Sequence, residues 1–100
     1  MLKIEAVFER QDKGYLVSLI LNVESKYKVA VSSDGDEYDI FISSNEVIMR
    51  VRIDPKPLPN HIMKHYSDYS YIEIEGYHQI SLNIIAQILQ TSSIKFNFSV

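Results

Sequence analysis

The segment that most constrains the fold is residues 77–91, YHQISLNIIAQILQT, which alone has the pattern of a full-length helix. It carries no charge unless His78 is protonated. At about 100° per residue, its isoleucines and leucines cover well over half of the helix circumference, and its amide side chains form one narrow polar stripe. An apolar arc of this width predicts a buried helix at about residues 78–91 that lies deep against a sheet.

Alternating apolar and polar residues predict that the first half of the chain is a sheet. Residues 2–9 and 15–21 alternate on either side of a turn at 11–14, and three more strands fit within 27–53. We therefore expect a five-stranded antiparallel β-meander over residues 2–53. The second of these strands is apolar on both faces, which predicts a central or doubly covered position.

Two turn signals set the expected register. Asp34-Gly35 favours a two-residue type I′ loop, and Ser44-Asn45 can form a similar loop. Both loops place apolar residues on one face of the sheet and opposite charges on the other. The expected opposite pairs are Val31–Tyr38, Tyr38–Val51, Asp39–Arg50 and Glu37–Arg52.

The second half of the chain completes an α+β fold in one domain, residues 1–100. Three prolines within residues 54–59 cannot donate ladder hydrogen bonds, so they predict an extended crossover. A short strand at 71–75 precedes the buried helix, and alternation at 93–100 predicts a C-terminal strand.

Composition excludes several classes of protein. A net charge of −3 does not fit the positively charged surface of a nucleic-acid-binding protein. The absence of cysteine excludes disulfides and thiolate sites. The N-terminal alternation differs from a signal peptide, and no stretch approaches the roughly 20 apolar residues that span a bilayer. We therefore expect a cytoplasmic protein that binds neither nucleic acid nor a membrane.

Catalytic motifs are missing from the sequence. No serine lies in Gly-x-Ser-x-Gly, and the three glycines are isolated, so there is no phosphate-binding loop. The faint helix-turn-helix pattern at 84–98 fails because its last residues alternate as a strand. We expect a protein that is not an enzyme and has no cofactor.

Histidines offer the one set of residues with metal-ligand chemistry. His61 and His65 are four residues apart, so both imidazoles would lie on one face of a short helix. The candidates for a third ligand are His78, Asp68 and Glu73. Ile62 stands where a zinc protease has its glutamate, so the general base is missing. The alternative is that these are surface histidines around a loop.

Tyrosines and serines in residues 66–71 predict a protein-binding surface, because this composition combines rigid contact area with adaptable hydrogen bonds. Phe41 and Ile48, which the expected register exposes, add an apolar spot. The alternative is that the tyrosines fill space between the crossover and the sheet. The predicted protein-binding residues are Tyr66, Tyr69, Tyr71, Tyr77, Phe41 and Ile48.

Three functions remain open. The first is a small non-enzymatic protein-binding module, such as an inhibitor, an immunity-type protein or an accessory protein of a bacterium or phage. The second is a small-ligand or metal-binding protein that uses the three histidines. The third is a structural subunit that self-assembles into a homo-oligomer through a sheet edge.

Overall fold

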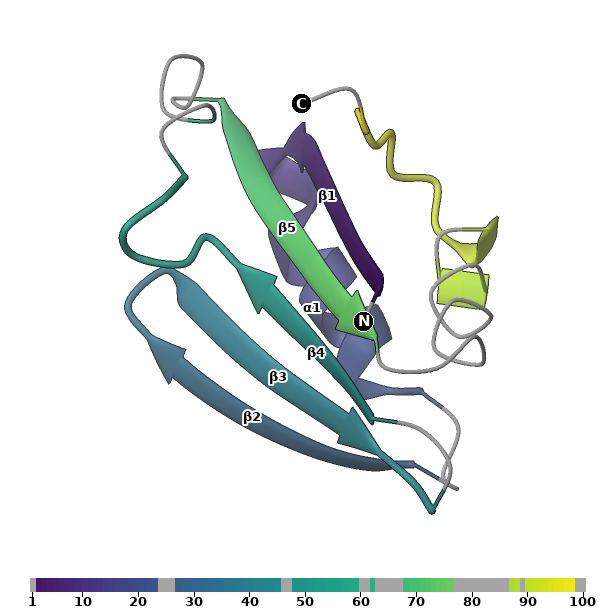
Figure 1. Ribbon diagram of the computed structural model, residues 1–100. Coiled ribbons are helices and arrows are strands. Elements are labelled where there is room, and N and C mark those ends of the chain that lie inside the picture. Colours follow the sequence, from purple (N-terminus) through teal and green to yellow (C-terminus); the bar gives the residue numbers. More distant parts are fainter. Residues whose placement is uncertain are drawn as a thin grey trace.

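The computed structural model describes residues 2–23, 27–45, 48–59, 62, 68–76, 87–88 and 90–98. Figure 1 shows these residues as one sheet with a helix behind it. In chain order the elements are β1 (Leu2–Glu9), the 3-10 helix η1 (Arg10–Asp12), α1 (Lys13–Leu21), β2 (Lys28–Asp34), β3 (Glu37–Ser43), β4 (Ile48–Ile53) and β5 (Tyr69–Gly76).

All five strands form one antiparallel sheet in the order β1-β5-β4-β3-β2. Strands β2 to β5 make a meander, and β1 completes the sheet beside β5. The predicted α+β fold with a five-stranded antiparallel sheet is therefore confirmed. The meander runs over residues 28–76 instead of 2–53, because the short strand predicted at 71–75 is a full member of the sheet.

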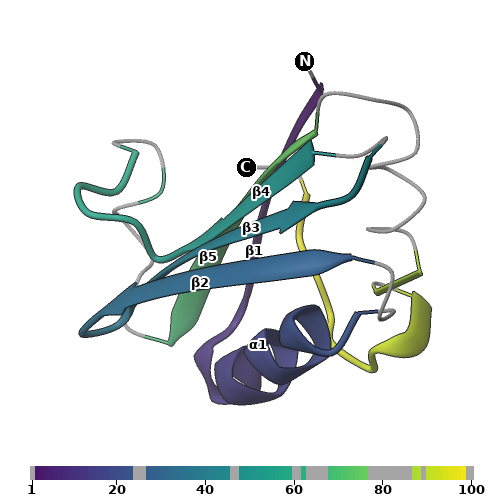
Figure 2. The ribbon, with the colours of Figure 1, turned by 90° about the horizontal axis from the view of Figure 1, so that it is seen from below.

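One face of the sheet, which we call the inner face, carries α1. Figure 2 shows α1 and the segment that contains residues 92–98 on this same side. Three residues of α1, Leu16, Val17 and Ile20, bury their side chains against the apolar residues of the strands. Buried strand residues in this core are Ala6, Phe8, Ile40, Ile42, Met49, Val51, Ile53, Ile72 and Ile74.

The prediction of a strand at residues 15–21 is wrong, since this segment forms most of the helix α1. Its buried residues Leu16, Val17 and Ile20 have the spacing of one helix face, whereas Tyr15 and Leu21 on the expected strand face are exposed. A run that is apolar at nearly every position fits the periodicity of a strand and that of a helix, and packing of these residues against the sheet favours the helix. The backbone N–H and side chain of Asn22 donate to the Ser18 carbonyl, which ends α1.

The register of the first hairpin differs from the expected one by two residues. Val31 lies opposite Ile40, so Asp34 and Glu37 flank the loop. Gly35 is the first loop residue and has a φ of 61°, the left-handed conformation that a type II′ loop requires at this position. A shift of two residues keeps every side chain on its predicted face.

The second hairpin is shifted in the same way, because Ser43 lies opposite Ile48, so four residues instead of two separate the paired ends of the strands. Tyr38 lies opposite Ile53, and Asp39 lies opposite Arg52. The predicted direct pairs between β3 and β4 are therefore wrong, although the alternation of faces is right. Ile40 lies between Val51 and Val31, in the middle of the inner face.

The C-terminal strand predicted at 93–100 is reduced to a single bridge among the described residues. Asn97 and Val7 exchange two backbone hydrogen bonds of 2.9 and 3.0 Å, which cover part of the outer edge of β1. Ile94 is buried in the core, and the rings of Phe8 and Phe96 lie 5.8 Å apart. Residues 92–98 therefore contact the other described residues mainly through side chains and only at one point through backbone hydrogen bonds to β1.

The buried helix predicted at about 78–91 lies mostly outside the described residues. Gln87, Ile88, Gln90 and Thr91 are helical, and Ile88 packs against the core. The N–H of Ser92 donates to the Ile88 carbonyl at 3.1 Å, so the described part ends where the sequence predicts.

Candidate functional site

The outer face of the sheet, which points away from α1, carries charged side chains at alternate positions. Because strand residues alternate between faces, Glu5 of β1, Glu73 of β5, Arg52 of β4 and Asp39 of β3 form one row across four strands. The neighbouring row contains Lys3, Glu75, Arg50 and Phe41.

Ion pairs connect these rows. Arg50 donates two hydrogen bonds to Asp39, with its Nε 2.9 Å from Oδ1 and its Nη2 2.6 Å from Oδ2. The predicted Asp39–Arg50 pair is therefore confirmed, although the two residues are diagonal neighbours. Arg52 bonds to Glu73, and the Nζ of Lys3 lies 3.8 Å from that carboxylate.

The predicted Glu37–Arg52 pair is wrong, because the two-residue shift places Arg52 between Asp39 and Glu73. The Nη2 of Arg52 also lies 3.7 Å from Glu75, whereas its buried Nε finds no acceptor among the described residues. Through these ion pairs, Arg52 links β4 to β5.

Glu73 is nearly buried, at 3% exposure, yet its surroundings favour the charged form. Burial would raise its pKa, but the hydrogen bond and the charge of Arg52, together with Glu75 and the charge of Lys3, outweigh burial and hold the pKa below the usual range. The hydroxyl of Tyr71 also donates to Glu73 at 3.1 Å. Burial, together with the negative charges of Glu73 and Glu5, raises the pKa of Tyr71.

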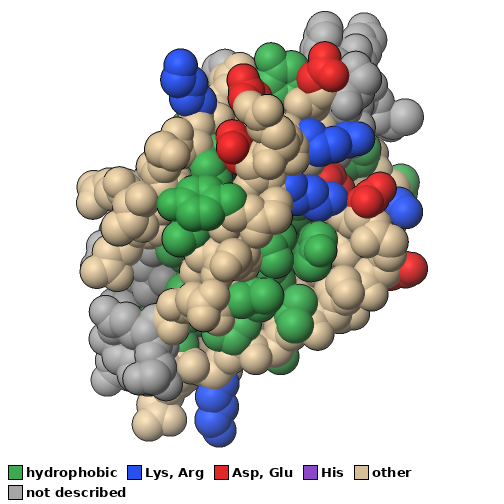
Figure 3. Space-filling view, turned by 180° about the vertical axis from the view of Figure 1, so that it is seen from behind, with side chains coloured by type: hydrophobic (Ala, Val, Ile, Leu, Met, Phe, Trp, Pro, Cys, Tyr) green, Lys and Arg blue, Asp and Glu red, His purple; other side chains and the backbone are tan. Residues whose placement is uncertain are grey.

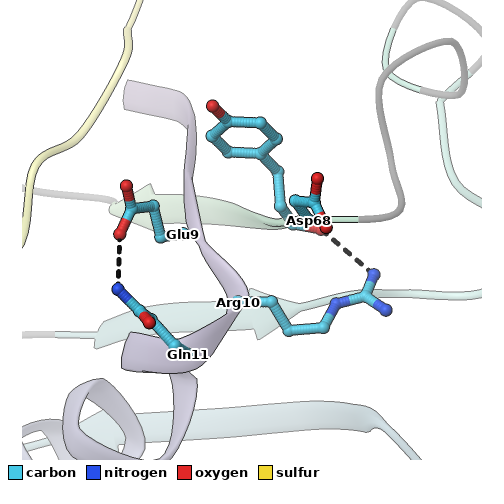
Figure 4. A pocket seen from close by; sticks show the side chains of 5 residues that line it. Glu9, Arg10, Gln11 and Asp68 are labelled. Carbon is cyan, nitrogen blue, oxygen red and sulfur yellow. Dashed lines mark hydrogen bonds between the residues drawn. The ribbon is translucent and has the colours of Figure 1, made fainter.

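A shallow polar hollow of about 480 Å³ lies where β1 passes into η1, beside the start of β5. In Figure 4, Glu9 and Gln11 point toward one another, and the Gln11 amide donates to the Glu9 carboxylate at 2.7 Å. The Arg10 guanidinium bonds to the Tyr69 carbonyl at 3.0 Å, which ties η1 to β5. The remaining wall residue is Asp68.

An apolar spot lies at the other end of the outer face. Phe41 is 45% exposed and Ile48 is 50% exposed, as the sequence predicts. The Arg50 guanidinium lies 5.0 Å from the centre of the Phe41 ring. We call these three residues the Phe41 spot.

The predicted binding residues therefore do not form one cluster. Phe41 is level with Glu75, which is six residues from Tyr69 along β5, so about 20 Å of strand separates the Phe41 spot from the hollow. Tyr69 is 42% exposed and lines the hollow. Tyr71 is fully buried, so its predicted place on a binding surface is wrong. Predicted residues that lie outside the described residues are Tyr66, Tyr77, His61, His65 and His78.

A Lys–Asp–Ser cluster, which sequence reasoning missed, joins α1 to the sheet. The Asp54 carboxylate accepts hydrogen bonds from Lys13 Nζ at 2.7 Å, from Ser70 Oγ at 2.9 Å and from the Tyr71 N–H at 2.9 Å. Ser70 is completely buried and Asp54 is 6% exposed, so the cluster is structural. The Asp-Pro sequence at the end of β4 was the available signal.

The described residues limit two other readings of the site. No group of three or more histidine, cysteine, aspartate or glutamate residues among them could hold a metal ion. Within the same part of the chain, no helix has the length and apolar character needed to cross a bilayer.

Comparisons of this chain with protein-family models, with curated proteins and with solved structures give no match.

Proposed function

We propose that this protein is a small non-enzymatic protein-binding module that contacts its partner through the outer face of its sheet. The observation that carries the proposal is the Phe41 spot. Aromatic residues and arginine are enriched in the cores of protein interfaces, and both supply large contact areas. The exposed Phe41 and the half-buried Arg50 place these two side-chain types beside the exposed aliphatic side chain of Ile48.

Rigidity supports this role. β3 is paired on both sides, with β2 and with β4, so the backbone under Phe41 is fixed. Arg50 is held by its two hydrogen bonds to Asp39, which keep the guanidinium over the ring. A partner that covers the spot therefore orders few additional side chains, which lowers the entropy cost of binding.

The hollow supplies a second contact in the same proposal. Its walls carry two carboxylates, an amide, the side chain of Arg10 and the ring of Tyr69, which together can contact a polar side chain of the partner. An interface of standard size buries about 800 Å² on each partner, which corresponds to a patch about 30 Å across. Such a patch reaches both the hollow and the Phe41 spot.

The charged centre of the outer face supports a binding role over a catalytic one. Arg50, Arg52 and Glu73 are held by ion pairs within the sheet, and Ser70 is buried as a donor to Asp54. The metal-binding alternative stays a prediction, because its three histidines lie outside the described residues.

Capture experiments with surface variants test the proposal. The full chain, tethered to a resin, is exposed to lysate of its source organism, and retained proteins are compared among wild type, Phe41→Ser and Ile48→Ser. Tyr15→Ser is the matched control, because Tyr15 is 48% exposed on α1, on the opposite side.

We expect the two outer-face variants to retain at least about tenfold less of a specific partner, as is typical of interface anchors, while the control retains it. Circular dichroism verifies that each variant is folded. Equal retention by folded Phe41→Ser would contradict the proposal.

A further inference from the structure

The edge strand β2 is the longest uncovered backbone surface in the described part of the sheet. The other edge strand, β1, is partly covered by the bridge between Val7 and Asn97. β2 pairs with β3 on one side, and six of its seven residues are exposed. It contains no proline, and its pairing with β3 continues without a bulge, so it lacks two common protections of edge strands.

The hairpin register determines which backbone groups face outward. Asp34 and Glu37 flank a two-residue loop, so they exchange hydrogen bonds, and every second residue from Asp34 does the same. The N–H and C=O groups of Val29, Val31 and Ser33 therefore point away from β3. No described residue lies against them as a strand partner.

We propose that β2 pairs with β2 of a second copy of this chain, antiparallel and centred on Val31, so that the two sheets join into one continuous sheet. An antiparallel pair is compatible with the closed two-fold symmetry of homodimers. The outward-facing residues then meet outward-facing residues, since Val31 lies opposite Val31 and Val29 opposite Ser33. Each of these pairs exchanges two backbone hydrogen bonds.

Charge complementarity selects this register. Centring on Val31 uses all seven residues of β2 and places Lys28 opposite Asp34 twice, once at each end. A register centred on Ala30 or on Ser32 also matches the backbone groups, but it sets Lys28 opposite Ser32 or Asp34 opposite Ala30. These registers use fewer residues and form neither ion pair.

Hydrophobic burial favours the same pairing. Val31 is 51% exposed on the inner face, next to the half-buried Val29, whose side chain packs against the core. Figure 3 views the side that carries α1 and shows hydrophobic side chains gathered over its centre. Apposed Val31 side chains at the two-fold axis extend this apolar layer and remove both from water.

The proposed dimer would also bring the Phe41 spots of the two copies close together, although the dimer itself does not depend on the Phe41 spot. A two-fold axis perpendicular to the sheet keeps the outer faces of both copies on one side. Phe41 is one strand away from β2, opposite Ala30. The two Phe41 residues are then about 16 Å apart, at the usual strand spacing and rise, so the dimer presents both spots on one face.

Sedimentation equilibrium of the full chain, from micromolar to submillimolar concentration, tests the proposal. We expect a monomer–dimer equilibrium for the wild type and a monomer for Val31→Pro. Proline removes an outward N–H without removing a bond to β3, so the protomer stays folded, which circular dichroism verifies.

Charge exchange tests the register and does not depend on the proline variant. Lys28→Asp and Asp34→Lys each place like charges opposite one another, so each should raise the dissociation constant about tenfold. The double variant restores opposite charges, so its dissociation constant should return to within about threefold of wild type. A wild-type monomer at all concentrations would overturn the proposal, as would a dimer whose affinity these variants leave unchanged.

Discussion

The ion pair between Lys13 and Asp54 should be one of the stronger single contacts between α1 and the sheet. The Lys13 Nζ lies 2.7 Å from Asp54 Oδ2, and the two side chains are only 14% and 7% exposed. Lys13 also donates to the Asp36 carbonyl and lies 5.6 Å from the centre of the Tyr38 ring. Its ammonium group is therefore shielded from water on several sides.

Burial sets the expected magnitude. Ion pairs on the surface contribute about 0.2–1 kcal/mol, whereas removing one partner of a buried pair costs about 3–5 kcal/mol. Because Lys13 keeps some exposure, we expect Asp54→Asn to lower the free energy of unfolding by about 3 kcal/mol and Lys13→Met by about 2 kcal/mol. Asparagine tolerates the left-handed φ of 50° at position 54, so the substitution tests charge.

Urea denaturation of the wild type, both single variants and the double variant gives the coupling energy, which we expect to be about 2 kcal/mol. The control cycle uses Asp39→Asn and Arg50→Met, whose side chains are more exposed, at 26% and 33%. The control coupling should be below about 1 kcal/mol. A Lys13–Asp54 coupling no larger than the control would refute the argument from shielding.

Three further outcomes follow from the structure. Gly35→Ala should lower the free energy of unfolding by about 1–2 kcal/mol, because φ is 61° at this position. Gly14→Ala in α1 should raise it by about 0.5–1 kcal/mol, because an added Cβ meets nothing within 4 Å there. Equal effects of the two substitutions in urea titrations would contradict this prediction. The hydrogen bond from Arg50 lowers the pKa of Asp39 below its ordinary 3.8, so this carboxylate stabilises the fold above that pH and loses its contribution as the pH falls through the lowered pKa. The stability difference between wild type and Asp39→Asn should therefore shrink from about pH 6 to about pH 2, and a constant difference would count against it. Ile94→Ala should lower the thermal midpoint and cost about 2–4 kcal/mol, since Ile94 is 8% exposed in the core; a change within error would show that the C-terminal segment does not seal the sheet.

Alternation predicted the faces of the strands well, because a buried inner face forces apolar residues to every second position. It could not predict the register, since a shift of two residues leaves every face unchanged. The loop conformation distinguishes the two registers, because a type I′ loop at Asp34-Gly35 needs a positive φ at both residues, whereas only Gly35 has one. Charge pairing was a weaker guide, because Asp39 reaches Arg50 along a diagonal.

The segment at 15–21 shows where local pattern fails. Its apolar residues satisfy a strand and a helix about equally, and only the sheet beneath decides which of them are buried. Binding residues were harder to predict for a related reason. Tyr69 and Tyr71 lie on the same face of β5, yet one is 42% exposed and the other fully buried, a difference that depends on what covers each end of the strand.

The position of β5 between β1 and β4 has a consequence for synthesis. β1 is made before every other strand of the sheet, but the strand that pairs with it ends at Gly76. At about 5–20 residues per second, the ribosome needs several seconds to make the residues between them. During that interval β2, β3 and β4 can pair with one another, whereas β4 lacks its second neighbour and β1 lacks its strand partner. The sheet can therefore close only late, and a chain interrupted before β5 would leave β1 and β4 as two open edges for chaperones or for aggregation.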